Sequence, residues 1–196
     1  DQVDFELKRG ERVALTGPNG AGKTTFLHLL VGLKKPKTGQ IWAFGQTRND
    51  EKEFVEVRAR AGFLFQDPDD QLFCPTVLED VAFGPLNLGK SRTEALQIAK
   101  DTLASLGMAG FEERITHQLS GGEKRMITLA AVLAMEPDVL LLDEPSNALD
   151  VKARQRLIDT LLSLPQAMVI VSHDADLVDQ LSTRELRLEN AALTDI

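Results

Sequence analysis

Cysteine, tyrosine and long apolar runs are scarce or missing in this sequence of 196 residues. The single cysteine, Cys74, has no second cysteine with which to form a disulfide in the chain, which agrees with a reducing compartment. The longest apolar run, residues 129–135, falls far short of the roughly 20 residues that span a bilayer as a helix. A disulfide-stapled secreted domain is therefore excluded, and any role at a membrane requires a partner.

Positive charge is also scarce. The 22 Lys and Arg residues are outnumbered by 30 Asp and Glu residues, which gives a formal net charge of −8 at pH 7. Proteins that bind nucleic acids displace counterions from phosphates with a basic surface, and this composition does not supply one. We therefore expect no nucleic acid among the partners of the chain.

The remaining composition, 43% hydrophobic and 27% charged, suits one compact domain with a buried core. Strand-like and helix-like patterns alternate, which predicts an α/β fold with a mostly parallel sheet. The core is expected at about residues 1–68 and 137–196, with a helical insert at about residues 69–136. Since the chain begins with Asp1 rather than Met and enters a strand-like pattern at once, we expect a natural N-terminal segment to precede it.

Local patterns predict the individual elements. Apolar residues at helical spacing indicate helices, whereas short and nearly continuous apolar runs indicate buried parallel strands. Strands are expected at residues 3–17, as two short strands around a turn, and at 39–46, 61–66, 138–145 and 167–174. Helices are expected at residues 22–32, 91–107, about 118–135 and 151–164.

The stretch GPNGAGKT, residues 17–24, fits the phosphate-loop pattern G-x-x-x-x-G-K-[ST] and lies between a predicted strand and a predicted helix. Its glycines let successive backbone N–H groups converge on phosphates at the start of the helix. Lys23 is expected to reach the β- and γ-phosphates, and the Thr24 hydroxyl to ligate Mg²⁺. The predicted nucleotide-binding residues of this loop are Gly17, Pro18, Asn19, Gly20, Ala21, Gly22, Lys23, Thr24 and Thr25.

Two acidic residues follow a predicted buried strand, where a nucleotide site needs them. Asp143 is expected to hold Mg²⁺, and Glu144 to polarise the attacking water as a general base. Adjacent acids could instead cap a turn, but the phosphate loop favours the catalytic role. His173 ends the next buried strand, at the sheet edge where ligands bind, and is predicted to contact the γ-phosphate region and to position Glu144 or the water.

A second glycine-rich loop, QLSGGEKR at residues 118–125, also precedes a predicted helix and could offer N–H groups to an anion. Along the chain, GPNGAGKTT and FLFQDP come before this loop, and VLLLDEP, SNALD and VSHD follow it. With these motifs the chain resembles, over essentially its whole length, the ATPase subunits of ATP-binding cassette transporters. The resemblance implies a P-loop NTPase fold with a RecA-like core, a helical insert and a small N-terminal antiparallel β subdomain.

The resemblance also implies ligands and partners. ATP and Mg²⁺ are the expected ligands, and two subunits, identical or different, would pair head to tail. Ser120, Gly121 and Gly122 would then hold the γ-phosphate of the nucleotide bound to the other subunit. Gln66 would ligate Mg²⁺ and take part in catalysis while moving with the helical insert. The expected location is the cytoplasmic face of the cell membrane, where an integral membrane transporter subunit would hold the chain.

A narrower resemblance, at residues 65–85 and the FGPLNLG run, is to the energy-coupling factor branch, whose members import cobalt, nickel and vitamins. The alternative is the ATPase of another transporter in the family. A soluble member in DNA repair or translation is a weaker alternative, because no long coiled coil interrupts the motifs and a single set of them is present. The transported substrate does not follow from the sequence.

The family resemblance further implies a groove, drawn from residues 66–86, that receives a short helix of the membrane subunit. Its expected apolar floor and charged rim consist of Phe73, Val77, Leu78 and Phe83, and of Glu79 and Asp80, respectively. Cys74 lies within this stretch and is expected either in the groove or as a small buried apolar residue.

Four features depart from the family pattern. Glu123 stands where glutamine is common, and no phosphate contact is assigned to it because a carboxylate repels phosphate. Asn147 and Ala148 replace the commoner Ala-Gly. The chain has no tyrosine, so the aromatic residue that stacks on adenine is expected upstream of Asp1, while Trp42 is expected to pack inside.

Overall fold

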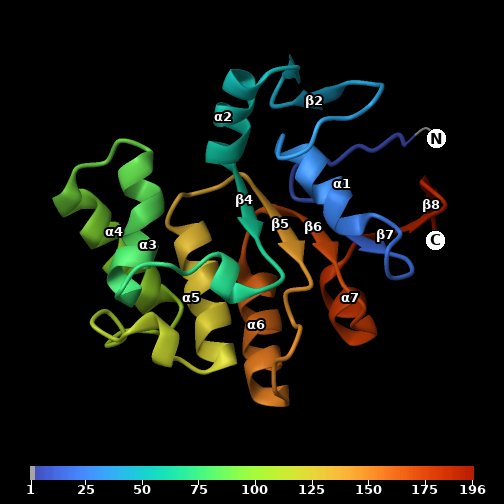
Figure 1. Ribbon diagram of the computed structural model, residues 1–196. Coiled ribbons are helices and arrows are strands. Elements are labelled where there is room, and N and C mark those ends of the chain that lie inside the picture. Colours follow the sequence, from blue (N-terminus) through green and yellow to red (C-terminus); the bar gives the residue numbers. More distant parts are fainter. Residues whose placement is uncertain (1–2) are drawn as a thin grey trace.

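The computed structural model describes residues 3–196, which form a six-stranded sheet, a separate two-stranded sheet, and helices on both faces of the larger sheet (Figure 1). The larger sheet runs, in spatial order, through β4 (Ala61–Leu64), β5 (Val139–Asp143), β6 (Ala167–Val171), β1 (Arg12–Thr16), β7 (Arg184–Glu189) and β8 (Ala192–Asp195). All neighbours pair in parallel except β7 and β8, which are antiparallel. The prediction of a mostly parallel α/β sheet is confirmed.

The register of the central strands brings their carboxyl ends to one edge. Val171, the last residue of β6, pairs with Asp143 at the end of β5 and with Leu15 near the end of β1. The segments that follow these strands are therefore neighbours in space, although they lie far apart in the sequence. Such an edge is where open parallel sheets bind ligands.

Helices cover the sheet from both sides because its central strands are apolar on both faces. On β5, Leu140 and Leu142 belong to one buried cluster, whereas Leu141 between them belongs to the other. The helices are α1 (Lys23–Leu30), α2 (Glu51–Arg60), α3 (Val77–Asn87), α4 (Arg92–Ser105), α5 (Gly121–Leu133), α6 (Val151–Ser163) and α7 (Ala175–Leu181), with short 3₁₀ turns at Pro68–Asp70 and Thr116–Gln118.

The predicted helical insert is also present. Helices α3 and α4, drawn in green in Figure 1, lie to one side of the sheet, and α5 stands between them and the sheet. All three contribute to the same buried cluster as one face of the sheet. Among residues 3–196, no helix combines the length and the apolar character that crossing a membrane requires.

Some element predictions are wrong. Residues 3–7, expected as a strand, have no strand assignment. Residues 39–46, expected as one strand, instead begin a hairpin of β2 (Ile41–Ala43) and β3 (Gln46–Arg48), because the chain turns at Phe44 and Gly45 with φ of 53° and 83°. Helices α2, α3 and α7 and strands β7 and β8 were not predicted at all.

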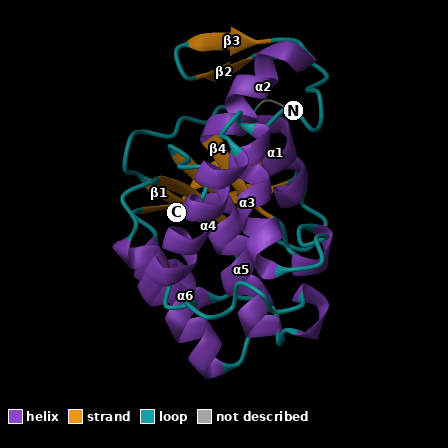
Figure 2. Ribbon diagram, turned by 90° about the vertical axis from the view of Figure 1, so that its left-hand side faces the viewer, coloured by secondary structure: helices purple, strands orange, loops and turns teal. Residues whose placement is uncertain are grey.

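The β2–β3 hairpin stands at one end of the molecule beside α2 (Figure 2). Trp42, expected to pack inside, is 70% exposed, because it lies on the outer face of a sheet of only two strands. Ile41 and Ala43, on the inner face, pack against the buried cluster. Alternation along the strand thus places Trp42 outside.

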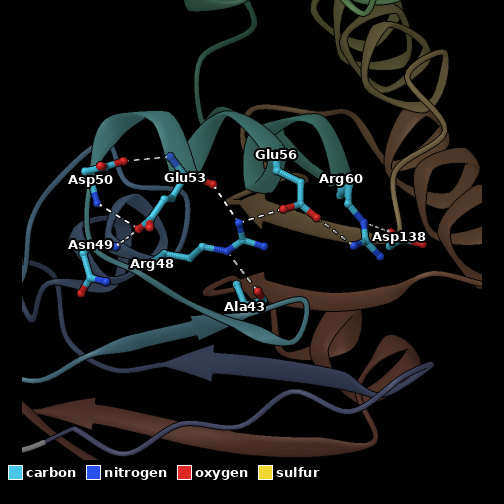
Figure 3. Close-up of polar contacts among 8 residues, drawn as sticks. All are labelled: Ala43, Arg48, Asn49, Asp50, Glu53, Glu56, Arg60 and Asp138. Atoms are coloured by element: carbon cyan, nitrogen blue, oxygen red, sulfur yellow. Dashed lines mark hydrogen bonds and ion pairs between the residues drawn. The ribbon is translucent and has the colours of Figure 1, made fainter.

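A chain of polar contacts ties the hairpin to the rest of the fold (Figure 3). Arg48 is buried and donates from Nε to the Ala43 carbonyl and from Nη1 to the Glu53 carbonyl, both at 3.1 Å. Its Nη1 also lies 2.8 Å from Glu56, which in turn pairs with Arg60. Arg60 reaches Asp138, just before β5, at 2.6 Å, so the contacts run from the hairpin through α2 to the sheet.

Candidate nucleotide site

The phosphate loop connects β1 to α1 and needs glycine for two separate reasons. Gly17, Gly20 and Gly22 have φ of 136°, 81° and 102°, a region that other residues rarely adopt. A Cβ on Gly17 would lie 2.2 Å from the Leu188 carbonyl oxygen. Gly22 is the N-cap of α1 and supplies no side-chain cap, so the first N–H groups of the helix are free of side-chain cap partners and face an anion site.

Lys23 projects from the start of α1 into this loop and is only 7% exposed. Its Nζ donates to the Gly17 carbonyl at 2.8 Å and to the Pro18 carbonyl at 3.1 Å. It also lies 3.2 Å from Nε2 of His173. Lys23 is thus held between the loop backbone and the histidine that follows β6.

Asp143, at the end of β5, has the features of a cation ligand. Its side chain is buried, and Oδ1 has no hydrogen-bond partner among the residues that the structure describes. Burial raises the pKa of Asp143, while a hydrogen bond from Thr24 and the nearby Lys23 and Arg125 act in the opposite direction. An unpartnered carboxylate oxygen beside a threonine hydroxyl fits a hard divalent cation such as Mg²⁺.

A Mg²⁺ ion at this site would also take ligands from nucleotide phosphates and water. Within residues 3–196, no three or more His, Cys, Asp and Glu side chains gather as a group that could hold a metal ion. This agrees with the usual Mg²⁺ site, in which one or two carboxylates combine with substrate phosphates and water. The residues present therefore fit Mg²⁺ that arrives with a nucleotide.

Glu144 follows Asp143 but turns away from it, because its backbone has a positive φ of 45°. Its N–H donates to the Val171 carbonyl at 2.8 Å, which fixes the turn against β6. The carboxylate accepts from the His173 N–H at 3.2 Å and lies 3.4 Å from His173 Nε2. Burial raises the pKa of Glu144, which makes its ionised form a better proton acceptor than an exposed glutamate.

These residues surround one cavity of about 500 Å³. It is lined by Asn19, Gly20, Gly22, Lys23, Thr24, Thr25, Gln66, Asp143, Glu144, Asn147, Val171 and His173. The structure thus brings together phosphate-loop residues with the acids, glutamine and histidine that were predicted from separate motifs. Asn147 also lines the cavity, although its sequence signal is only a departure from the family pattern.

The second glycine-rich loop does not line this cavity. Ser120 is instead the N-cap of α5, and its hydroxyl accepts from the Glu123 N–H at 3.3 Å. The Glu123 carboxylate accepts in return from the Ser120 N–H and hydroxyl, both at 2.8 Å, and pairs with Arg114. These contacts lower the pKa of Glu123, and the hydrogen bond from the Ser120 N–H has the largest effect. Glu123 therefore serves as a cap.

The two glycines of that loop differ in their surroundings. A Cβ on Gly122 would lie 2.7 Å from the Cβ of Ala153, so this glycine permits the close approach of α5 to α6. A Cβ on Gly121 would have no neighbour within 4 Å, and both Gly121 and Ser120 are exposed. Ser120 and Gly121 thus form an open helix start that the same chain leaves uncovered.

Comparison with known proteins agrees with the geometry. A family model described as ABC transporter matches residues 1–147. A protein of Brucella suis biovar 1, provisionally named an ABC transporter ATP-binding protein, is 54% identical over 193 residues, covering 98% of this chain and 80% of the relative. The energy-coupling factor transporter ATP-binding protein EcfA of Methanothermobacter thermautotrophicus is 43% identical over 196 residues, covering 97% of this chain but 63% of EcfA.

Solved structures give the same result. CbiO1 of Clostridium perfringens, described as part of the ABC transporter complex cbiONQ, superposes with a TM-score of 0.87 at 32% identity, covering 97% of this chain and 78% of CbiO1. The dimeric ATP-binding cassette MJ0796, bound to ADP and Pi, superposes with a TM-score of 0.89 at 27% identity, covering 99% and 88% of the two chains. With its phosphate loop, acidic strand end and P-loop NTPase fold, this chain belongs to the ABC transporter family of ATP-binding, ATP-hydrolysing proteins.

Proposed function

We propose that this chain is the ATP-hydrolysing subunit of a membrane importer of the energy-coupling factor type, which takes up a transition metal ion or a vitamin. The observation that carries the proposal is the cavity that joins Lys23, Asp143 and Glu144, while Ser120 lies open outside it. The names of EcfA and CbiO1 support the choice of branch.

In the proposed reaction, Lys23 neutralises charge on the β- and γ-phosphates, and Glu144 accepts a proton from water. The water oxygen attacks the γ-phosphorus in line, the bond from that phosphorus to the bridging oxygen breaks, and ADP leaves with that oxygen. His173 holds the Glu144 carboxylate through its peptide N–H. Mg²⁺, held by Thr24, Asp143 and Gln66, supplies further neutralisation of phosphate charge when bound.

The proposed complete site needs a second subunit. Ser120, Gly121 and Gly122 would place the start of α5 against the γ-phosphate of a nucleotide bound to the partner, in a head-to-tail dimer of identical or different chains. Two observations support this: these residues do not line the cavity of their own chain, and the structural relative MJ0796 is described as dimeric.

Removing the proton acceptor tests the reaction. Glu144→Gln keeps the shape of the side chain but removes the carboxylate, so turnover should fall by about 10²-fold or more while ATP binding survives. An ATP-dependent dimer should accumulate in light scattering. Glu113→Gln, a matched change on the exposed surface, should keep normal turnover. Near-normal turnover of Glu144→Gln would refute the role of Glu144.

Mixed dimers test the head-to-tail arrangement. Combining a Lys23→Ala subunit with a Ser120→Arg subunit places both changes at one composite site and leaves the other intact. We expect one nucleotide bound per mixed dimer, measured with labelled ATP after separation by two affinity tags. Loss of nucleotide from both sites would contradict the arrangement.

The proposed contact with the membrane subunit lies on the helical insert. Phe73 and Phe83 are 64% and 43% exposed, and their rings meet edge to face at 4.8 Å between centroids, forming an aromatic patch. Two residues expected in this groove are buried instead. Val77 is inside the core, and Asp80 accepts from the N–H groups of Phe73 and Cys74 and from a buried hydroxyl.

Phe83→Asp tests this contact, because a charge in an apolar interface should weaken assembly while leaving nucleotide binding unchanged. Trp42→Asp is the matched control on another exposed aromatic residue. Co-purification with candidate membrane subunits expressed together with this chain measures assembly. Cys74 is a poor target for a thiol reagent, since burial raises the pKa of its thiol to about 11.

Uptake of labelled cobalt, nickel or vitamins by the assembled transporter identifies the substrate.

A further inference from the structure

Arg125 is a buried cation directly beneath the loop that carries Gln66. It is 1% exposed and lies on α5, the helix that begins just after Ser120. Its guanidinium donates from Nη1 to the Phe65 carbonyl and from Nη2 to the Gln66 carbonyl, both at 2.6 Å. The planar fork of one side chain thus fixes two successive peptide groups of the loop.

Filling space does not explain a guanidinium at this position. Burial lowers the pKa of Arg125 to about 10, so it remains charged at neutral pH. Its Nε has no hydrogen-bond partner in the part of the chain that the structure describes, and the charges of Asp67 and Asp143 only partly offset its burial. Burying such a group is unfavourable, and an apolar side chain of similar volume often packs equally well or better.

The loop that Arg125 holds leads into the nucleotide cavity. Gln66 lines that cavity, and its side chain is exposed, so the loop backbone has to determine where the amide lies. The neighbouring residue on α5, Lys124, pairs with Asp69 at 2.6 Å. Two successive residues of α5, Lys124 and Arg125, therefore bind the loop on either side of Pro68.

We propose that Arg125 is a positioning residue for ATP hydrolysis, which fixes the backbone of Gln66 to the helix that begins at the Ser120 motif. The Gln66 amide is then held at the cavity of its own chain. The second consequence rests on the proposed head-to-tail dimer: movement of Gln66 in one nucleotide site moves Ser120 in the other, because Arg125 ties the Gln66 loop to the helix that Ser120 caps.

Kinetics in a double-mutant cycle test this role. Arg125→Met keeps the length of the side chain but removes its donors, so kcat should fall by about tenfold with KM for ATP changed by less than about threefold. Arg125→Lys, with one charged donor group, should give an intermediate kcat. In a Gln66→Ala background, Arg125→Met should lower kcat by less than about twofold further, because both changes remove the same positioned amide. Full multiplication of the two effects, or a normal kcat for Arg125→Met, would overturn the proposal.

Arg48→Met is the matched control. Arg48 is another buried arginine that donates to two backbone carbonyls, but it lies in the hairpin and does not line the cavity. This variant should be less stable yet retain normal kcat below its melting temperature. An equal fall in kcat for Arg48→Met would mean that general destabilisation explains the Arg125 result, and the proposal would be wrong.

A spin label tests the position of the loop without hydrolysis or a dimer. A nitroxide on Gln66→Cys, in a Cys74→Ser background, should give a spectrum of restricted motion that sharpens when Arg125→Met is added. If Arg125→Met does not fold, the same comparison is made with Arg125→Lys. Unchanged spectra would reject the role of Arg125. By contrast, failure of Glu144→Gln to form an ATP-dependent dimer would reject the head-to-tail proposal. The role of Arg125 would then be tested by the spin-label spectra alone.

Discussion

Arg48 and Arg125 make nearly the same contacts in two regions of the molecule. Each is almost fully buried, donates to two backbone carbonyls and leaves one nitrogen without a partner. The difference is in the compensating charge. Arg48 has the Glu56 carboxylate at 2.8 Å. The charge of Arg125 is favoured by two carboxylates, Asp67 in the loop that carries Gln66 and Asp143 at the candidate cation site.

A buried arginine that binds two carbonyls thus serves a different purpose in each region. At the hairpin the charge is neutralised within the fold, and the result is the attachment of a small sheet. Beneath the cavity the cation lies near groups that would meet Mg²⁺ and phosphate, so its surroundings should change with the nucleotide. Changes in the first region should therefore affect stability, and changes in the second should affect turnover.

The largest expected effect is at the cation site. Asp143→Asn should lower kcat by about 10²- to 10³-fold, because the ligand loses its charge. Its thermal stability should stay equal or rise, since the ionised form of Asp143 is disfavoured by burial. Hydrolysis assays and calorimetry measure both. Strong destabilisation by Asp143→Asn would remove the contrast between the two regions.

The next effect is at the hairpin. Arg48→Met should lower the free energy of unfolding by about 2–3 kcal/mol, because two carbonyls and the partly exposed Glu56 lose their partner. Urea titration of the two proteins gives the difference. Arg58→Met, on α2 and with its ion pair to Glu51 at the surface, is the control and should lose about 1 kcal/mol or less. Equal losses would show that burial of Arg48 is not decisive.

A third effect is intermediate and depends on pH. Asp174 pairs with Arg154 and accepts from Ser146, and these contacts lower its pKa from 3.8 to about 2, the Arg154 hydrogen bond most of all. A lowered pKa stabilises the fold above about pH 4, and this contribution disappears as the pH falls from about 4 towards 2. Asp174→Asn should thus cost about 1–2 kcal/mol at pH 7. The difference from the unmodified chain should shrink in urea titrations below pH 4, and a difference that grows there would contradict the pairing.

The smallest effect is expected at Trp42. Because this side chain is 70% exposed on the outer face of the hairpin, Trp42→Thr should change the free energy of unfolding by less than about 0.5 kcal/mol. Threonine keeps the strand preference of the position. A loss above 1 kcal/mol in urea titration would mean that the hairpin depends on Trp42 as well as on Arg48.

Local signals account for the parts of the molecule that the sequence predicts. The glycines and Lys23 of the phosphate loop act within a few residues of one another, and the apolar runs of β5 and β6 indicate buried strands without knowledge of the fold. Signals were available for two missed helices: Asp50 with Glu53, and Thr76 with Glu79, form capping boxes at the starts of α2 and α3. Pro85 inside α3 and the low apolar content of α2 weakened those signals.

Only the tertiary structure decided which side chains meet or stay in water. Lys23 and His173 are 150 positions apart, and Arg125 lies 59 positions from Gln66, so the sequence places each on an element but does not specify the contact. Trp42 and Asp80 show the same limit for burial: one is exposed and the other enclosed, against expectation. The physical reason is that burial depends on what packs against a face, whereas the chain itself determines only which residues share that face.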